Sequence, residues 1–153
     1  MREALYRGKR VDNKQWVYGN YFYGYADYSY LETIDKKHWI QGYDEKNHYF
    51  IYEVDGETVG QFAGLKDKNK TMIYEGDVVK QLFYKCNTYT DFEVSGEHVG
   101  TVKLTSKGVV LSPCITTFEE TTSEEAYKEP RKQWGVKVSS YRSEVIGNIH
   151  EVK

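Results

Sequence analysis

The sequence predicts a mainly β fold, built from small twisted sheets that form SH3-like or barrel-like lobes with little helix. Thirteen glycines and only two prolines divide the 153 residues into short pieces, and short runs between turn residues are typical of sandwiches and barrels. Aromatic residues make up 16% of the chain, including 15 tyrosines, and tyrosine favours strands. No stretch of helical length carries the apolar stripe of an amphipathic helix.

Alternating or apolar runs mark the individual strands. We expect extended segments at residues 21–25, 48–54, 77–84, 98–105, 108–111 and 143–152. In the first of them Tyr21, Tyr23 and Tyr25 share one face, because side chains alternate across a strand. We expect the closing segment to pair with an early strand. Residues 1–153 would then form a single domain, either around one core or as two closely packed β lobes.

Turn residues connect these segments. Hairpin turns are expected at Asp12-Asn13, Asp44-Glu45, Asp55-Gly56 and Ser106-Lys107-Gly108. Asp55-Gly56 is the strongest, because Asp-Gly suits a type I′ turn with positive φ at both central residues. A capping-box pattern from Thr122 to Glu125 predicts a short helix before Pro130, although the glutamates around it equally suit a solvated acidic loop.

Composition restricts the surroundings and the partners. The net charge is −2 and the isoelectric point is about 6.1, so nothing demands a polyanion or an anionic membrane as partner. No apolar run approaches the roughly 20 residues of a spanning helix, and residues 1–10 lack the apolar region of a signal peptide. Two cysteines make no disulfide framework. We expect a protein of a reducing, cytosolic compartment that does not contact the membrane.

Groups that could perform chemistry are scattered. Cys86 and Cys114 lack the flanking signatures of thiol enzymes, and the four histidines follow no metal-ligand spacing. Glu75 and Asp77 could share a proton or hold a cation. A turn is the stronger interpretation, with positive φ at Gly76 and Asp77 as the capping side chain. We therefore expect no catalytic residue, no cofactor and no metal.

Tyrosines form the candidate contact surface. They concentrate in the first third of the chain, and Tyr21, Tyr23 and Tyr25 are its central residues. Exposed rings can stack on nucleic-acid bases, but that mode needs cations, and residues 18–30 contain neither Lys nor Arg. Sheet packing or contact with another protein is favoured instead. A later basic group, opposed by Glu129, is interpreted as a solvated face. Its members are Lys128, Arg131, Lys132 and Lys137.

Four segments together resemble the YopX family. They are residues 1–8, residues 16–19, a central motif of residues 59–69 and 73–79, and residues 144–151. The resemblance implies a mostly β protein of phages or prophages, in a family with no established activity and therefore no catalytic residues to transfer. The motif residues are interpreted as structural; they are Gly60, Phe62, Gly64, Leu65, Asp67, Tyr74, Gly76 and Asp77.

The chain departs from this family pattern at one turn. The family usually has a glycine after Asp-Lys-Asn, whereas Lys70 and Thr71 follow Asn69 here. We expect Asn69 to adopt the left-handed conformation, or the turn to be looser.

Three functions remain open. The first is a non-enzymatic phage accessory protein that binds another protein or itself. The second is a nucleic-acid-binding small barrel. The third, and least favoured, is an enzyme that uses Glu75, Asp77 and a distant histidine.

Overall fold

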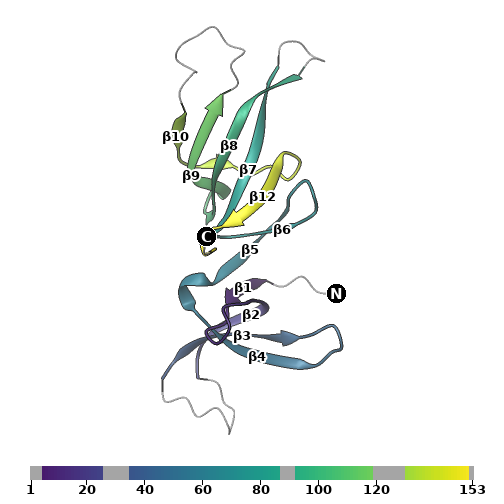
Figure 1. The fold of residues 1–153 in the computed structure, drawn as a ribbon, viewed down its shortest axis with the longest axis vertical. Helices are drawn as coiled ribbons and strands as arrows, with labels where there is room; N and C mark the ends of the chain where they lie inside the picture. Colours follow the sequence, from purple (N-terminus) through teal and green to yellow (C-terminus); the bar gives the residue numbers. More distant parts are fainter. Residues whose placement is uncertain (1–4, 26–34, 87–91, 119–129, 152–153) are drawn as a thin grey trace. The chain divides into compact units, whose positions relative to one another are not determined.

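A computed structural model describes residues 5–25, 35–86, 92–118 and 130–151, and these residues are almost entirely antiparallel strands (Figure 1). The described strands form two open six-stranded sheets, and neither sheet closes into a barrel. The only helical turn in the described residues is the 3₁₀ turn η1 (Gly56–Thr58). The predicted mainly β fold is confirmed. Within the same ranges, no helix has the length and apolar character needed to cross a membrane.

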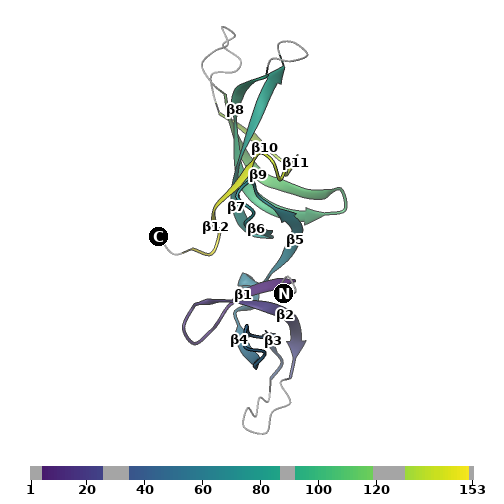
Figure 2. The same ribbon diagram turned by 90° about the vertical axis from the view of Figure 1, so that its right-hand side faces the viewer.

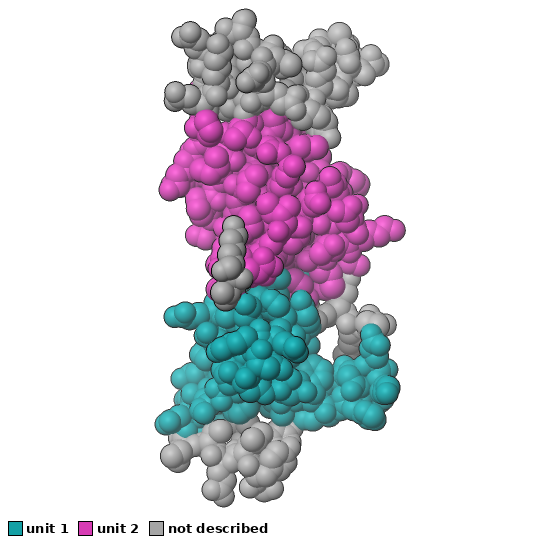
Figure 3. Space-filling view, viewed as in Figure 1, with its two compact units in different colours: residues 1–62 teal, residues 63–153 magenta. Residues whose placement is uncertain are grey.

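The chain divides into two compact units, unit 1 (residues 1–62) and unit 2 (residues 63–153), which are coloured separately in Figure 3. Strand β5 (Gly60–Lys66) begins in unit 1 and ends in unit 2. The expectation of a single domain over residues 1–153 stays a prediction.

Unit 1 is a curled antiparallel sheet. The sheet has the order β4-β3-β2-β1-β5-β6, of which β6 (Met72–Tyr74) belongs to unit 2. The bounds of its first four strands in the chain are β1 (Tyr6–Lys9), β2 (Trp16–Gly24), β3 (Lys37–Tyr43) and β4 (Tyr49–Val54). An isolated bridge joins Arg10 to Val54, and the Val11 N–H donates to the Glu53 carbonyl at 3.1 Å. These contacts bring the end of β1 against the end of β4, so the sheet bends around its inner face.

The inner face of unit 1 is closely packed. Ile40 and Val54 are almost completely buried on it. Gly8 lies opposite them, where an added Cβ would come within 3.1 Å of the Val54 Cβ. A larger residue here would force the Val54 and Ile40 side chains to shift by a few tenths of an ångström, so glycine eases the close approach of β1 to β4.

Unit 2 is dominated by three long strands that lie side by side in Figure 1. The sheet order is β10-β9-β8-β7-β12, and β11 also pairs with β9 (Figure 2). The bounds are β6 (Met72–Tyr74), β7 (Asp77–Cys86), β8 (Phe92–Thr105), β9 (Gly108–Phe118), β10 (Arg131–Gln133), β11 (Val136–Lys137) and β12 (Ser143–Asn148). The core consists of Ile73, Val79, Val102, Leu111 and Cys114.

Two local predictions are wrong. The closing strand β12 pairs with β7, with Ser143 opposite Gln81, and not with an early strand. Asp55-Gly56 does not form a type I′ turn, because Asp55 has a φ of −72° and its side chain caps η1 by accepting from the Glu57 N–H. The capping strength of the aspartate prevails over the Asp-Gly hairpin signal. Turns occur at the other three expected positions. The segment from Thr122 to Glu125 lies outside the described residues.

Candidate contact surface

The pairing register assigns the tyrosines of unit 1 to two faces. Side chains of residues directly opposite in neighbouring strands point to the same side of a sheet. Tyr21 lies opposite Ile40, and Tyr23 lies opposite His38, which in turn lies opposite Val54. Tyr21 and Tyr23 therefore belong to the inner face. Phe22 and, by the same alternation, Tyr18, Tyr43 and Tyr49 belong to the outer face.

Tyr21 is a packing residue at the rim of the inner face. Its ring centroid lies 5.7 Å from that of Tyr6, and its hydroxyl lies 2.6 Å from His38 Nδ1. Burial raises the pKa of Tyr21, and the neighbouring Tyr23 and Tyr6 hydroxyls raise it further. The half-buried ring thus adds apolar contact while its polar tip keeps a hydrogen-bond partner.

Tyr23 and Tyr25 are exposed. Their exposed fractions are 57% and 56%, although the Tyr23 ring still contacts His38 with centroids 4.7 Å apart. The predicted surface is therefore divided, with two residues facing solvent and Tyr21 mainly contributing to packing.

Three further tyrosines from the first third of the chain are exposed on unit 1, in addition to the predicted contact residues. Tyr18, Tyr43 and Tyr49 are 47%, 67% and 43% exposed. Tyr43 and Tyr49 are paired residues of β3 and β4 whose rings meet edge to face at 5.6 Å, and the Tyr49 hydroxyl donates to Gln41 Oε1 at 2.6 Å. Their positions depend on strand pairing, which the tyrosine surplus alone could not reveal.

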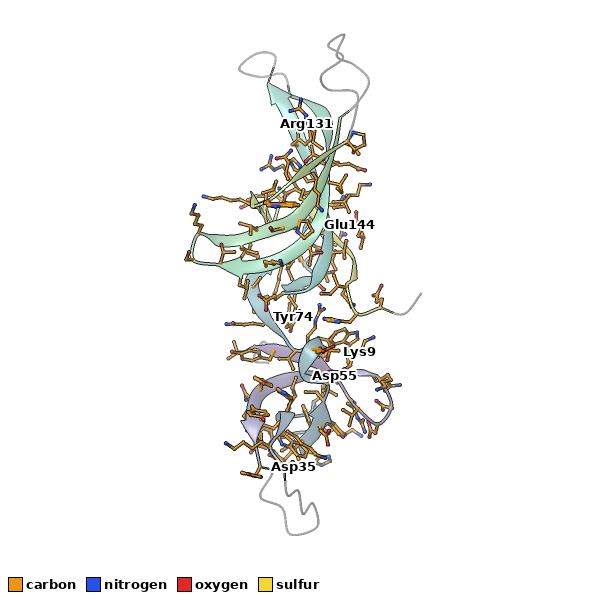
Figure 4. All side chains as sticks on the ribbon, turned by 90° about the vertical axis from the view of Figure 1, so that its left-hand side faces the viewer. Lys9, Asp35, Asp55, Tyr74, Arg131 and Glu144 are labelled. Atoms are coloured by element: carbon orange, nitrogen blue, oxygen red, sulfur yellow. The ribbon has the colours of Figure 1, made fainter. Side chains whose placement is uncertain are left out.

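Cations accompany these outer-face aromatics. Arg7 lies opposite Tyr18 and Lys9 lies opposite Trp16 in the register of β1 and β2. The Arg7 guanidinium carbon is 4.6 Å from the Trp16 ring centroid, and Lys9, labelled in Figure 4, places Nζ at 5.4 Å from it. Residues 18–30 contain no Lys or Arg, but the neighbouring strand β1 brings positive charge next to the aromatic rings of β2.

In the central motif, Asp67 connects two distant parts of unit 2. Its Oδ1 accepts from the backbone N–H groups of Asn69 and Thr71, each at 2.9 Å. Its Oδ2 accepts from the Val145 N–H on β12 at 2.9 Å, and this carboxylate-bearing residue is 5% exposed. One side chain thus closes the turn after β5 and binds the outer edge of the closing strand.

The same turn corrects the expectation for Asn69. Lys70, not Asn69, adopts the left-handed conformation, with a φ of +65°. The structure therefore places the left-handed residue at the position where the resemblance implies a glycine. For lysine this conformation costs free energy that glycine would not pay.

The remaining motif residues lie along β5 and the β6–β7 turn. Gly60 pairs with Arg7, and the Phe62 N–H donates to the Leu5 carbonyl at 2.7 Å. Gly64 has a φ of +80°, and Leu65 packs against the unit 2 core.

At the β6–β7 turn, Asp77 Oδ2 accepts from the N–H of Tyr74, which is labelled in Figure 4, at 2.8 Å. Gly76 has a φ of +92°, and an added Cβ there would lie 3.9 Å from His150 Nε2. Glu75 Oε2 accepts from the Leu104 N–H at 3.4 Å. The structure brings Glu75, Asp77 and His150 to one turn, where both carboxylates bind backbone N–H groups.

A polar row crosses the inner face of unit 2 beside the core. Ser143, Gln81, His98 and Thr116 lie opposite one another in four successive strands. His98 Nδ1 lies 2.7 Å from Thr116 Oγ1, which also accepts from Gln133 Nε2 at 2.8 Å. Burial lowers the pKa of His98, and the charge of Arg142 lowers it further.

Cys114 adjoins this row. Burial raises the pKa of its thiol, which outweighs the hydrogen bond from Thr116 that favours the thiolate. Reactive cysteines have a lowered pKa and partial exposure, whereas Cys114 is fully buried. The environment favours a packing role for this side chain.

The comparisons with known proteins give one match. A family model described as YopX protein matches residues 5–152, nearly the whole chain. No curated protein and no solved structure matches the chain.

Proposed function

Because the chain belongs to the YopX family, a membership that names no activity, we propose that it is a non-enzymatic accessory protein of a phage or prophage. It acts in the cytoplasm of the bacterial host. There it binds a protein partner, or a second copy of itself, through the tyrosines of unit 1.

The observation that carries this proposal is the exposure of tyrosines on both faces of one small sheet. These residues are Tyr18, Tyr23, Tyr25, Tyr43 and Tyr49, with exposed fractions from 43% to 67%. Tyrosine is enriched in protein interfaces, where it supplies a large contact area with few rotatable bonds. Exposed aromatic residues are also common binding hot spots.

The hydrogen bonds of the sheet support a preorganised surface. Tyr49 is held by Gln41 and by the edge of the Tyr43 ring, and Tyr23 rests on His38. A ring that is already oriented loses less conformational entropy when a partner binds.

The test combines light scattering with capture of partners from host lysate. We expect a stable multimer or a specific captured protein, and we expect Tyr43→Ser with Tyr18→Ser to weaken that association by about tenfold or more. Tyr141→Ser is the matched control, because Tyr141 is 91% exposed and belongs to unit 2. A monomer that captures nothing would contradict the proposal, as would equal weakening by the control.

A further inference from the structure

One edge of unit 2 combines positive charge with an exposed aromatic ring. Residues 130–137 contain Arg131, Lys132 and Lys137 but no Asp or Glu. They include β10 and β11, which both pair with β9; Arg131 is labelled in Figure 4. The sequence alone favoured a solvated face here, so the arrangement of these side chains decides the interpretation.

The register places three lysines on one face. Lys137 lies opposite Val110, which lies opposite Lys103. Lys132 lies opposite Ile115, which lies opposite Val99. Val99 and Lys103 are four residues apart on β8 and so point to the same side. Lys103, Lys132 and Lys137 therefore share the outer face of the sheet, opposite the core.

Trp134 stands between β10 and β11 at the same edge. It is 61% exposed, and Lys132 Nζ lies 4.8 Å from its ring centroid. Gly135 follows with a φ of +80° and donates its N–H to the Leu111 carbonyl at 3.1 Å. This irregularity between two short strands redirects a side chain, as bulges commonly do, and presents the indole beside the lysine.

The charge of this face is unbalanced. Its carboxylates Glu97 and Glu144 are already paired, with Lys80 at 3.3 Å and with Lys68 at 3.5 Å. By contrast, no carboxylate of the described ranges pairs with Lys103, Lys132 or Lys137. Within the described residues, this edge therefore carries positive charge that no carboxylate pairs with, although the whole chain has a net charge of −2.

We propose that this basic edge, defined as Lys103, Lys132, Trp134 and Lys137, binds single-stranded nucleic acid. The lysines bind backbone phosphates, and a base stacks on the indole of Trp134. This site is separate from the tyrosines of unit 1 and goes beyond the proposed protein contact. Cations beside an exposed ring are the combination that single-strand binding uses, whereas an acidic peptide would use the cations and leave the ring without a role.

The test is a fluorescence anisotropy titration of the full chain with a labelled oligothymidine over a salt series. We expect binding at low salt, with log K falling linearly against log salt by about 0.7 for each phosphate contact. Trp134→Ala should weaken binding by about tenfold through the lost stacking. Lys132→Glu should weaken binding and reduce the salt slope by about 0.7.

Matched controls lie elsewhere on the surface. Lys46→Glu makes the same charge change at an exposed turn of unit 1, and Tyr141→Ala removes an exposed ring from unit 2. Both should bind oligothymidine within about twofold of the unchanged protein. Circular dichroism should show every variant to be folded, since all the altered side chains are at the surface.

Four outcomes would overturn the proposal. They are no binding at low salt, equal weakening by Lys46→Glu, unchanged affinity in Trp134→Ala, and tighter binding of polyglutamate than of oligothymidine. Unchanged affinity in Trp134→Ala would show that the lysines bind polyanions without any stacking on the indole. Tighter binding of polyglutamate would identify an acidic protein as the partner.

Discussion

Unit 1 and unit 2 are both antiparallel sheets, but different side chains fill their inner faces. On the inner face of unit 1 the buried core is small, with Ile40 and Val54, and half-buried Tyr21 extends it with a ring whose hydroxyl contacts His38. Trp39 is buried on the outer face, where it lies opposite Phe22. In unit 2 a contiguous aliphatic cluster forms the core, and a row of polar side chains satisfied mainly within the sheet lies beside it.

The difference shows how a polar composition can still give a folded sheet. Tyrosine can be placed on either face of a sheet, because its ring packs and its hydroxyl tolerates water. Unit 1 thus carries rings on both faces and exposes several of them. Unit 2 gathers its fully buried aliphatic residues on the inner face, and its outer face carries lysines among valine and isoleucine side chains.

Matched core truncations test this comparison most strongly. Leu111→Ala and Ile40→Ala each remove a side chain that is 0% exposed. We expect a loss of about 3 to 5 kcal/mol in unfolding free energy for Leu111→Ala and about 2 to 3 kcal/mol for Ile40→Ala. The smaller loss reflects the smaller core around Ile40. Urea unfolding followed by circular dichroism measures both, with Tyr141→Ala as the neutral control. A larger loss for Ile40→Ala would reverse the comparison.

Removing the Asp67 carboxylate should be the next largest effect. Asp67→Ala leaves three backbone N–H groups without their acceptor, so we expect a loss of about 2 to 3 kcal/mol in unfolding free energy. Asp67→Asn keeps one acceptor oxygen and should lose less. Urea unfolding measures both variants. Equal stability of Asp67→Ala and the unchanged protein would show that the turn and β12 hold without this side chain.

Glycine at the left-handed position should stabilise unit 2. Lys70→Gly removes the cost of a φ of +65° but adds backbone entropy to the unfolded chain, so we expect a net gain of up to about 1 kcal/mol. Lys70→Ala removes the same charge and keeps the strained conformation, so it should give no gain. Thermal unfolding compares the three proteins. A gain for alanine as large as that for glycine would assign the effect to charge.

The polar row should make stability fall in mild acid. The lowered pKa of folded His98 means that the unfolded chain binds more protons between that pKa and the unfolded value of about 6.5. The contribution of His98 to the free energy of unfolding is therefore complete above pH 6.5. It declines as the pH falls below 6.5 toward the lowered pKa of the folded state. Unfolding free energies measured across this range should show a weaker decline in His98→Gln. If the unfolding free energy of His98→Gln declined with pH as steeply as that of the unchanged protein, titratable groups other than His98 would cause the decline.

Local patterns predicted much of the fold. Period-two alternation located β2, β4, β7 and β8, and short apolar runs located β9 and β12. Alternation also placed Tyr21 and Tyr23 on one face, as the register confirms. The partner of β12 and the buried or exposed status of each tyrosine could not be predicted, since both depend on pairing between distant segments. The Asp55-Gly56 and Asn69 errors have a different cause. There, the carboxylates of Asp55 and Asp67 accept hydrogen bonds from backbone N–H groups and so fix the backbone conformation.

The candidate contact surface was only partly accessible from sequence. The tyrosine surplus pointed to unit 1, but the cations beside Trp16 come from the neighbouring strand β1. Likewise, Lys103 joins Lys132 and Lys137 only through the register across β9. Surfaces assembled across strands require the pairing to be known before their charge can be judged.

The bond from Asp67 to Val145 has a consequence for synthesis on the ribosome. Its two ends are 78 residues apart, which at roughly 5 to 20 residues per second corresponds to a delay of about 4 to 16 s. During that interval the β7–β8 and β8–β9 hairpins can form while the edge that receives β12 is still open. An uncovered edge is a site for mispairing between nascent chains. Slow translation or crowded polysomes would therefore be most hazardous to this protein just before its closing strand emerges.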